Sequence, residues 1–261
     1  MTALAVLLRD GVQRLADSSD SARVDCEILL CHVLNKPRSF LFSHPEHELS
    51  AAQQAQYLDW LQRRVDGQPV AYLIGRQAFY QHGFLVSSDT LIPRADTELL
   101  VDAVLERIPE STAARIADLG TGTGAIAISL ALARPHWQLE AVDFTVAILD
   151  LVQRNVSRLK AHNVNILQSN WCARLRGEYH AIVSNPPYIA EQDRHLEQGD
   201  LRFEPRTALV AGEDGLDDIR IIAAQSKPLL IGSEEHTSEL QSRGLISDAV
   251  VLVQTKINPA T

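Results

Sequence analysis

The pattern of apolar and polar positions changes near residue 76, and this change predicts two structural regions. Upstream, residues 22–34 and 50–65 carry apolar side chains at helical spacing. Ser50-Ala51-Ala52-Gln53 is a capping box for the second of these helices, and Gly67 suits its C-terminal cap. We therefore predict a small helical bundle over residues 1–75, with Phe40-Leu41-Phe42 in its core.

Downstream, alternation of apolar and polar residues within 77–93 predicts a short hairpin, in a linker over 76–95. Apolar runs at 115–119, 138–142, 180–184 and 228–231 then predict buried strands, and residues 125–132 predict a helix. Strands that alternate with helices are typical of a parallel sheet covered on both faces. We predict an α/β domain over residues 96–231, with the polar loop at 191–200 as a candidate lid.

A glycine-rich turn follows the first strand of this domain. Gly120-Thr121-Gly122-Thr123-Gly124 joins the strand to the helix, so free backbone N–H groups and a helix N-terminus face an anion or carboxylate. Asp143 follows the next strand, about twenty residues on, where an acid in this type of fold binds ribose hydroxyls. The spacing is G-x-G-x-G and not the G-x-G-x-x-G of dinucleotide-binding proteins, which disfavours binding of a dinucleotide pyrophosphate.

The tetrapeptide Asn185-Pro186-Pro187-Tyr188 closes a later strand. Prolines donate no N–H and hold φ near −65°, so the strand ends in a rigid turn. The Asn185 amide, nearby carbonyls and the Tyr188 ring can surround a planar –NH2 group. An ordinary strand-ending turn is the alternative for an isolated Asn-Pro-Pro, and the glycine turn and acid upstream favour the pocket.

These motifs together resemble the class I methyltransferases that use S-adenosylmethionine. More narrowly, the chain is similar to the HemK/PrmC glutamine methyltransferases of class-I peptide chain release factors, from about residue 21 to about 230. The similarity includes residues 67–75, the segment Leu91-Ile92-Pro93-Arg94-Ala95-Asp96-Thr97-Glu98, residues 118–124 and 185–189, and Arg202-Phe203-Glu204-Pro205. Ala95 stands where the family usually has proline, and Asn170 where it usually has an acid.

The resemblance implies a Rossmann-like methyltransferase domain that methylates the glutamine of a Gly-Gly-Gln motif. It implies Asn185, Pro186 and Tyr188 as catalytic residues, and these with Pro187 as the substrate-binding set. The implied S-adenosylmethionine-binding residues are Asp118, Gly120, Thr121, Gly122, Thr123, Gly124, Asp143, Asn170, Trp171 and Asn185.

Two other functions are compatible with these motifs. Asn-Pro-Pro-Tyr also fits an adenine-specific DNA or RNA methyltransferase, although a net charge of −9 disfavours a long duplex as the main partner. An inactive, truncated chain is the second alternative. Residues 233–242 (SEEHTSELQS) resemble the translation of a sequencing adapter, so we expect residues 232–261 to be a non-native tail. The sheet would then be truncated at its C-terminal end, with an unpaired apolar edge at residues 228–231.

Composition is that of an ordinary globular enzyme, with 46% hydrophobic residues and no apolar run of transmembrane length. The three cysteines and nine histidines lack metal-ligand spacing, so we propose no metal site and expect reduced thiols. We expect a cytoplasmic monomer that acts on release factors, with no stable nucleic-acid complex and no membrane association.

Overall fold

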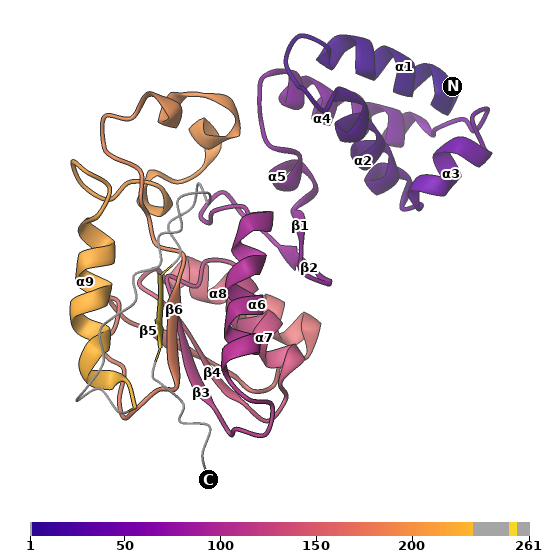
Figure 1. Ribbon diagram of the computed structural model, residues 1–261. Helices are drawn as coiled ribbons and strands as arrows, with labels where there is room; N and C mark the ends of the chain where they lie inside the picture. Colours follow the sequence, from indigo (N-terminus) through magenta and orange to yellow (C-terminus); the bar gives the residue numbers. More distant parts are fainter. Residues whose placement is uncertain (1, 232–250, 255–261) are drawn as a thin grey trace. The chain divides into compact units, whose positions relative to one another are not determined.

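The computed structural model describes residues 2–231 and the strand at 251–254 (Figure 1). The described residues form two compact units. The first contains the residues up to Gly75 together with Gln198–Phe203; the second contains Arg76–Glu197 and the described residues from Glu204 onward. Apart from the strand at 251–254, the expected non-native tail at 232–261 lies outside the described residues.

The first unit is helical, in agreement with the sequence pattern. Its helices are α1 (Leu4–Leu15), α2 (Ala22–Leu34), α3 (Arg38–Ser43), α4 (Ala51–Val65) and α5 (Val70–Ile74). The capping box of α4 is confirmed, because Gln53 N donates to Ser50 Oγ (3.3 Å) and Ser50 N donates to Gln53 Oε1 (3.0 Å). Leucines of α1, α2 and α4 pack around Tyr57, which is fully buried.

The prediction that the whole of Phe40-Leu41-Phe42 lies in the core is wrong for Phe42. Leu41 is buried, but Phe42 is 54% exposed. The reason is geometric: α3 has only six residues, and consecutive side chains of a helix point to different sides.

The short segment Gln198–Phe203 packs with the first unit although it follows the Asn185 turn in sequence. It contains the 3-10 helix η3 (Gly199–Phe203). Arg64 Nη1 donates to Asp200 Oδ1 (2.8 Å) and Arg64 Nε donates to Asp25 Oδ2 (2.7 Å). Because Arg64 and Asp25 are largely buried, this ion-pair network holds the segment to α2 and α4. The sequence pattern did not predict that residues 198–203 belong to the first unit.

The second unit contains a five-stranded sheet in the order β5-β4-β3-β6-β7. Its strands are β3 (Arg115–Leu119), β4 (Gln138–Asp143), β5 (Val164–Gln168), β6 (Ala181–Ser184) and β7 (Val251–Gln254). The first four of these run parallel, and β7 pairs with β6 in the antiparallel direction. A two-stranded hairpin, β1 (Arg76–Phe79) and β2 (His82–Leu85), precedes the sheet as predicted.

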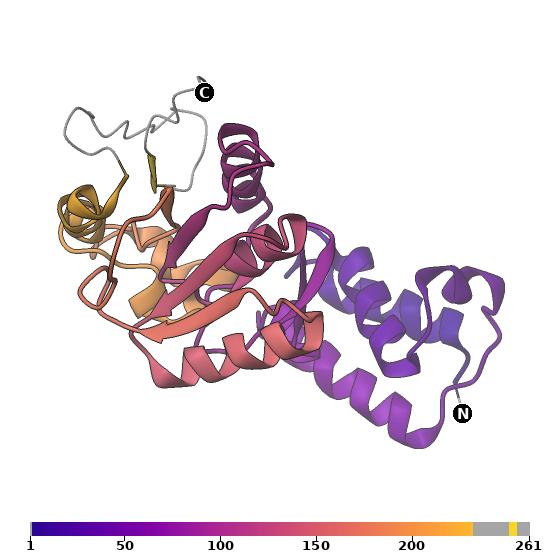
Figure 2. The ribbon, with the colours of Figure 1, turned by 90° about the horizontal axis from the view of Figure 1, so that it is seen from below.

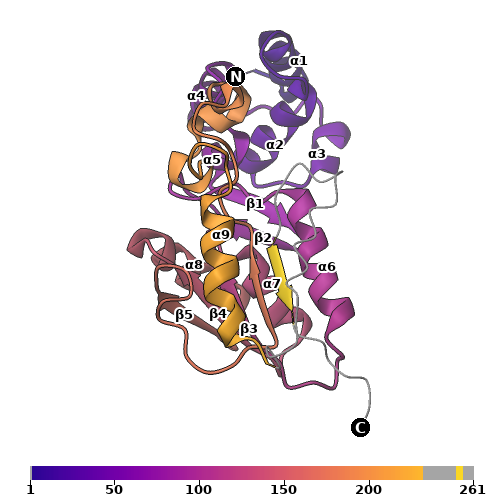
Figure 3. The same ribbon diagram turned by 60° about the vertical axis from the view of Figure 1, so that its left-hand side comes forward.

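Helices cover both faces of this sheet (Figures 1 and 3). The helices are α6 (Glu98–Arg107), α7 (Ala125–Ala133) and α8 (Val146–Leu159) on one face and α9 (Asp217–Ser226) on the other. Side chains alternate along the strands, so that Ile116 of β3 packs on the first face and Ala117 on the second. Figure 2 views the sheet from below, with α8 running along it. The predicted doubly covered α/β fold is confirmed.

The strand predicted at 228–231 is wrong. Lys227–Leu229 form a 3-10 helix, and only Leu230 makes a bridge, to Tyr179. Pro228 lies in the first turn of that helix and has no N–H for a strand ladder. The prediction that residues 228–231 form an unpaired edge strand is therefore also wrong. Among the described residues, the strand beyond β6 in the sheet is β7. Within the described residues, no helix is long and apolar enough to span a membrane.

Candidate functional site

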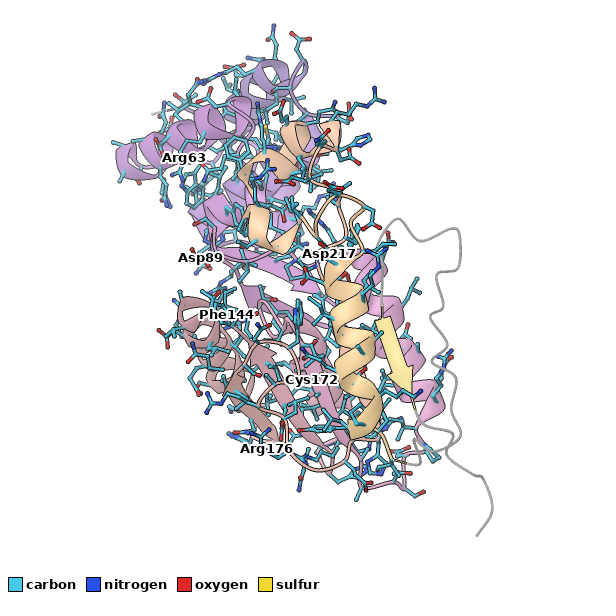
Figure 4. All side chains as sticks on the ribbon, turned by 90° about the vertical axis from the view of Figure 1, so that its left-hand side faces the viewer. Arg63, Asp89, Phe144, Cys172, Arg176 and Asp217 are labelled. Carbon is cyan, nitrogen blue, oxygen red and sulfur yellow. The ribbon has the colours of Figure 1, made fainter. Side chains whose placement is uncertain are left out.

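A cavity of about 370 Å³ lies at the carboxyl ends of the parallel strands, within the second unit. Its wall includes Phe79 and the segment around Leu91 on one side and residues after β3, β4, β5 and β6 on the other. Asp89 and Phe144 belong to this wall, whereas Arg176, which precedes β6, lies toward the opposite end of the sheet (Figure 4). Carboxyl ends of parallel strands are where open α/β sheets bind ligands.

The glycine turn after β3 forms one wall of the cavity through Gly120, Thr121, Gly122 and Thr123. All three glycines of the turn have positive φ, a conformation that L side chains rarely adopt. Gly124 is not among the described lining residues; it is the N-cap of α7, and a Cβ there would meet Ile128 at 2.9 Å. Its role is therefore to shape the turn.

Asp118 lies directly behind this turn and is fully buried. Thr121 Oγ1 donates to Asp118 Oδ2 (2.6 Å), and the Ala127 N–H donates to the same oxygen (3.1 Å). Burial raises the pKa of Asp118 to about 7, against the opposing effect of these two hydrogen bonds. Asp118 Oδ1 has no partner among the described residues, and a buried acceptor without a partner costs about 1–3 kcal/mol. Such an acceptor suits a cationic ligand group.

Asp143, at the end of β4, lines the cavity. Its carboxylate accepts hydrogen bonds from Gly122 N (3.3 Å) and Thr145 N (3.1 Å), so β4 and the glycine turn are held together. Burial raises the pKa of Asp143, and backbone hydrogen bonds, including these two, oppose that shift. The side chain is placed to accept further hydrogen bonds from ligand hydroxyls.

Asn170 and Trp171 line the cavity after β5. Trp171 has φ 46°, an uncommon value for a residue other than glycine. Asp218, another residue of the cavity wall, has its pKa raised by burial, and the neighbouring Trp171 side chain opposes that shift. Asp218 was missed by the sequence analysis, because nothing in the pattern of α9 shows that one of its acids faces a cavity formed by other strands.

The Asn185 turn forms the wall beyond β6. Ser184 Oγ donates to Leu119 O (2.7 Å), which fixes the end of β6 beside β3. Asn185 Nδ2 donates to Thr97 Oγ1 (3.2 Å), while Asn185 Oδ1 is buried with no partner among the described residues. Asn185 and Pro187 line the cavity.

Pro186 and Tyr188, two of the expected catalytic residues, are not among the described lining residues. The Tyr188 side chain packs against the core on the α9 face of the sheet. The backbone after the turn is held by the segment at 209–212, since Ile189 N donates to Leu209 O (2.8 Å) and Ala211 N donates to Ile189 O (3.1 Å). The proposed stacking of the Tyr188 ring on a substrate amide stays a prediction.

Residues 92–98, which lead into the start of α6, make four contacts that the sequence analysis did not assign. Arg94 Nη2 donates to Glu204 Oε1 (2.5 Å), and Ile92 N donates to Glu204 Oε2 (3.1 Å). The Glu204 side chain is fully buried. Tyr80 N donates to Glu98 Oε1 (2.6 Å), and Thr97 meets Asn185. The sequence analysis recognised residues 91–98 and 202–205 as similar to the family. Only the fold shows that these two segments contact each other.

The hydrogen-bond acceptors in and behind the cavity wall fit S-adenosylmethionine. Asn185 Oδ1 and the carboxylate of Asp143, both from lining residues, can accept hydrogen bonds from amide and hydroxyl groups. Asp118, which lies behind the glycine turn and is not among the described lining residues, offers a further unpartnered buried oxygen, Oδ1. The glycine turn allows close approach to its backbone. Over residues 2–231, no group of three His, Cys, Asp or Glu side chains is arranged to hold a metal ion.

Comparison with known proteins gives matches over both units. Residues 6–75 match the PrmC N-terminal domain, and residues 95–202 match the methyltransferase small domain. A protein from Escherichia coli K12 named release factor glutamine methyltransferase is 49% identical over 225 residues, 86% of this chain and 80% of that protein. Proteins of the same name from Xylella fastidiosa Temecula1 and Coxiella burnetii are 50% identical over 203 residues and 44% identical over 220 residues. These matches cover 77% and 84% of this chain, and 74% and 79% of the two relatives.

Proposed function

Because this chain belongs to the family of release factor glutamine methyltransferases, we propose that it methylates a glutamine side chain of class-I peptide chain release factors. The methyl donor is S-adenosylmethionine, as in the class I methyltransferases whose fold the second unit shares. The acceptor is the side-chain amide nitrogen of the glutamine in a Gly-Gly-Gln motif.

The observation that carries this proposal is the buried, unpartnered Oδ1 of Asn185 in a cavity that also carries the glycine turn and Asp143. A substrate amide brings an –NH2 group whose protons need acceptors. The free oxygen of Asn185 supplies one acceptor, and the Pro186 carbonyl is proposed as the second. The unfavourable burial of Oδ1 is then relieved when the substrate amide binds.

An amide nitrogen is a poor nucleophile, because its lone pair is delocalised into the carbonyl group. No side chain of ordinary pKa deprotonates a neutral amide near pH 7, so the rate has to come from positioning and hydrogen bonding. Asn185 and Pro186 hold the –NH2 protons and so direct the lone pair toward the methyl donor. When bound, S-adenosylmethionine supplies a methyl group on a positively charged sulfonium. The N–C bond forms as the S–C bond breaks, and the nitrogen then releases one proton to water.

The predicted cofactor-binding residues other than Asn185 bind the methyl donor. Asp118 and the glycine turn hold the methionine part, with the free Oδ1 of Asp118 toward its ammonium group. Asp143 accepts from the ribose hydroxyls, and Trp171 with Asn170 borders the adenine region. The Tyr188 ring stacks on the substrate amide once the release factor is bound.

The partner assignment also draws on charge. A release factor works next to ribosomal RNA, and an acidic enzyme with net charge −9 is electrostatically suited to a basic protein surface. We propose that the chain works in the cytoplasm as a monomer, without a stable nucleic-acid complex.

The proposal is tested by methyl transfer from labelled S-adenosylmethionine to three acceptors in parallel. These are a class-I release factor, the same factor with the Gly-Gly-Gln glutamine changed to alanine, and an adenine-containing DNA duplex. We expect label only in the unmodified release factor, and loss of that label with the Asn185→Ala enzyme. Label in the duplex would establish an adenine methyltransferase, and a soluble chain that labels none of the three would be the inactive product.

A further inference from the structure

Thr97 is the residue that the Asn185 side chain contacts. It ends the 3-10 helix η1 (Ala95–Thr97), immediately before α6, and is 4% exposed. Its Oγ1 accepts the hydrogen bond from Asn185 Nδ2 across 88 positions of sequence. Both residues line the cavity. Thr97 therefore lies beside the proposed acceptor group without belonging to the Asn185 turn.

In the structure the Nδ2 end of the Asn185 amide makes this hydrogen bond, so the other end is left for a ligand. With Nδ2 directed to Thr97, Oδ1 is the unpaired end. The opposite orientation would present Nδ2 protons to the protons of a substrate –NH2 group, and two donors form no hydrogen bond. An amide side chain rotates readily about its last torsion, so without a partner for Nδ2 both orientations become accessible.

Thr97 is itself held in place by its neighbours. The Thr97 N–H donates to Arg94 O (3.1 Å), and the Arg94 guanidinium is paired with the buried Glu204. On the other side, Glu98 accepts from Tyr80 N (2.6 Å). The hydroxyl of Thr97 is thus presented from a segment that is fixed on both sides.

We infer that Thr97 is a positioning residue for methyl transfer: it holds the Asn185 amide with its oxygen free to accept a proton of the substrate –NH2 group. This inference rests on the proposed function, because it assigns a task to Asn185 in that reaction. It predicts that Thr97 acts through Asn185 and contributes to turnover, with little effect on the affinity for S-adenosylmethionine.

The test compares Thr97→Val, which has the same shape but no hydroxyl, with Thr97→Ser, which keeps the hydroxyl. Thr112→Val is the matched control, since Thr112 precedes β3 and so lies toward the opposite end of the sheet from the cavity. For each protein, kcat and KM for the release factor, the Kd for S-adenosylmethionine and the Tm are measured. If Thr97→Val does not fold, Thr97→Ala takes its place.

We expect Thr97→Val to lower kcat about tenfold, the effect of one hydrogen bond, with the Kd for S-adenosylmethionine unchanged. Thr97→Ser and Thr112→Val should keep the wild-type kcat. In an Asn185→Ala background, Thr97→Val should have no further effect, because the group that it positions is absent.

The inference is overturned if Thr97→Val keeps the wild-type kcat, if Thr97→Ser is as impaired as Thr97→Val, or if the two substitutions act independently. A fall in Tm that accounts for the lost activity would overturn it too. These outcomes leave the proposed function standing. A wild-type chain that transfers no methyl group to the release factor overturns the proposed function and, with it, this inference.

Discussion

The side-chain amide of Asn155 pairs with both backbone groups of Leu85, which is 70 positions earlier in the chain. Leu85 N donates to Asn155 Oδ1 (2.8 Å), and Asn155 Nδ2 donates to Leu85 O (3.0 Å). The same Nδ2 also donates to Thr123 O in the glycine turn (2.9 Å). A fully buried residue of α8 therefore joins the hairpin to the loop that forms one wall of the cavity.

Asn155→Ala should destabilise the second unit by about 2–3 kcal/mol, because it leaves backbone groups of Leu85 and Thr123 without partners. The measurement is urea unfolding followed by far-UV circular dichroism. Asn165→Ala, at an exposed position of β5, is the matched control and should change the unfolding free energy little. Equal stability of the two variants would show that the Asn155 bridge is dispensable.

Asp143→Ala should weaken binding of S-adenosylmethionine by about 1.5–3 kcal/mol, the range for hydrogen bonds to a charged group. Isothermal titration calorimetry gives the affinity directly. Asp150→Ala removes an acid from an exposed position of α8 and serves as the control. Unchanged affinity of Asp143→Ala would remove this carboxylate from the donor site.

Asn185→Ala should reduce kcat about 100-fold, the usual scale for loss of one preorganised hydrogen-bonding group. The Kd for S-adenosylmethionine should change far less, since the proposed role of Asn185 concerns the methyl acceptor. Single-turnover kinetics and titration calorimetry on the same preparation separate the two quantities. Near-normal turnover combined with a collapse of donor affinity would reverse the assignment.

Asp118 should make the folded state less stable as pH rises. Burial raises its pKa from 3.8 to about 7, so between these values the folded chain holds a proton that the unfolded chain has released. The contribution of this group to stability is therefore present below about pH 4 and falls by about 1.4 kcal/mol per pH unit until about pH 7.

Asp118→Asn removes this titration, and the variant should lose less stability than the wild type between pH 5 and pH 7. Urea unfolding at both pH values measures the difference. Asp150→Asn, at the surface, should keep the wild-type pH dependence. If all three proteins respond to pH alike, the carboxyl of Asp118 does not titrate in this window.

Asp218→Ala should lower the affinity for S-adenosylmethionine about tenfold, because the Trp171 indole loses the carboxylate that orients it in the cavity wall. The change should also appear in the tryptophan fluorescence of the free protein. Asp217→Ala is the control, since Asp217 is exposed at the start of α9 (Figure 4). If Asp218→Ala kept the wild-type affinity for S-adenosylmethionine, the contact between Asp218 and Trp171 would have no role in donor binding.

Local sequence was sufficient wherever one element determines its own conformation. The capping box at Ser50 and the strand at Arg115–Leu119 could be predicted because they depend on neighbours within a few positions. The glycine turn and the Asn185 turn were recognisable for the same reason. Local pattern failed at residues 228–231, where an apolar run forms a 3-10 helix, because proline in a short run outweighs hydrophobicity.

The amino-acid sequence by itself determined the alternation of helices and strands, the two loops proposed to bind cofactor and substrate, and the family. Tertiary structure alone decided which side chains complete the site: Thr97 beside Asn185, Glu204 under Arg94, Asp218 against Trp171 and Asn155 between hairpin and loop. The physical reason is that each of these contacts joins residues from elements far apart in the chain. Only the packing of helices on the sheet brings these side chains together, and no local period encodes that packing.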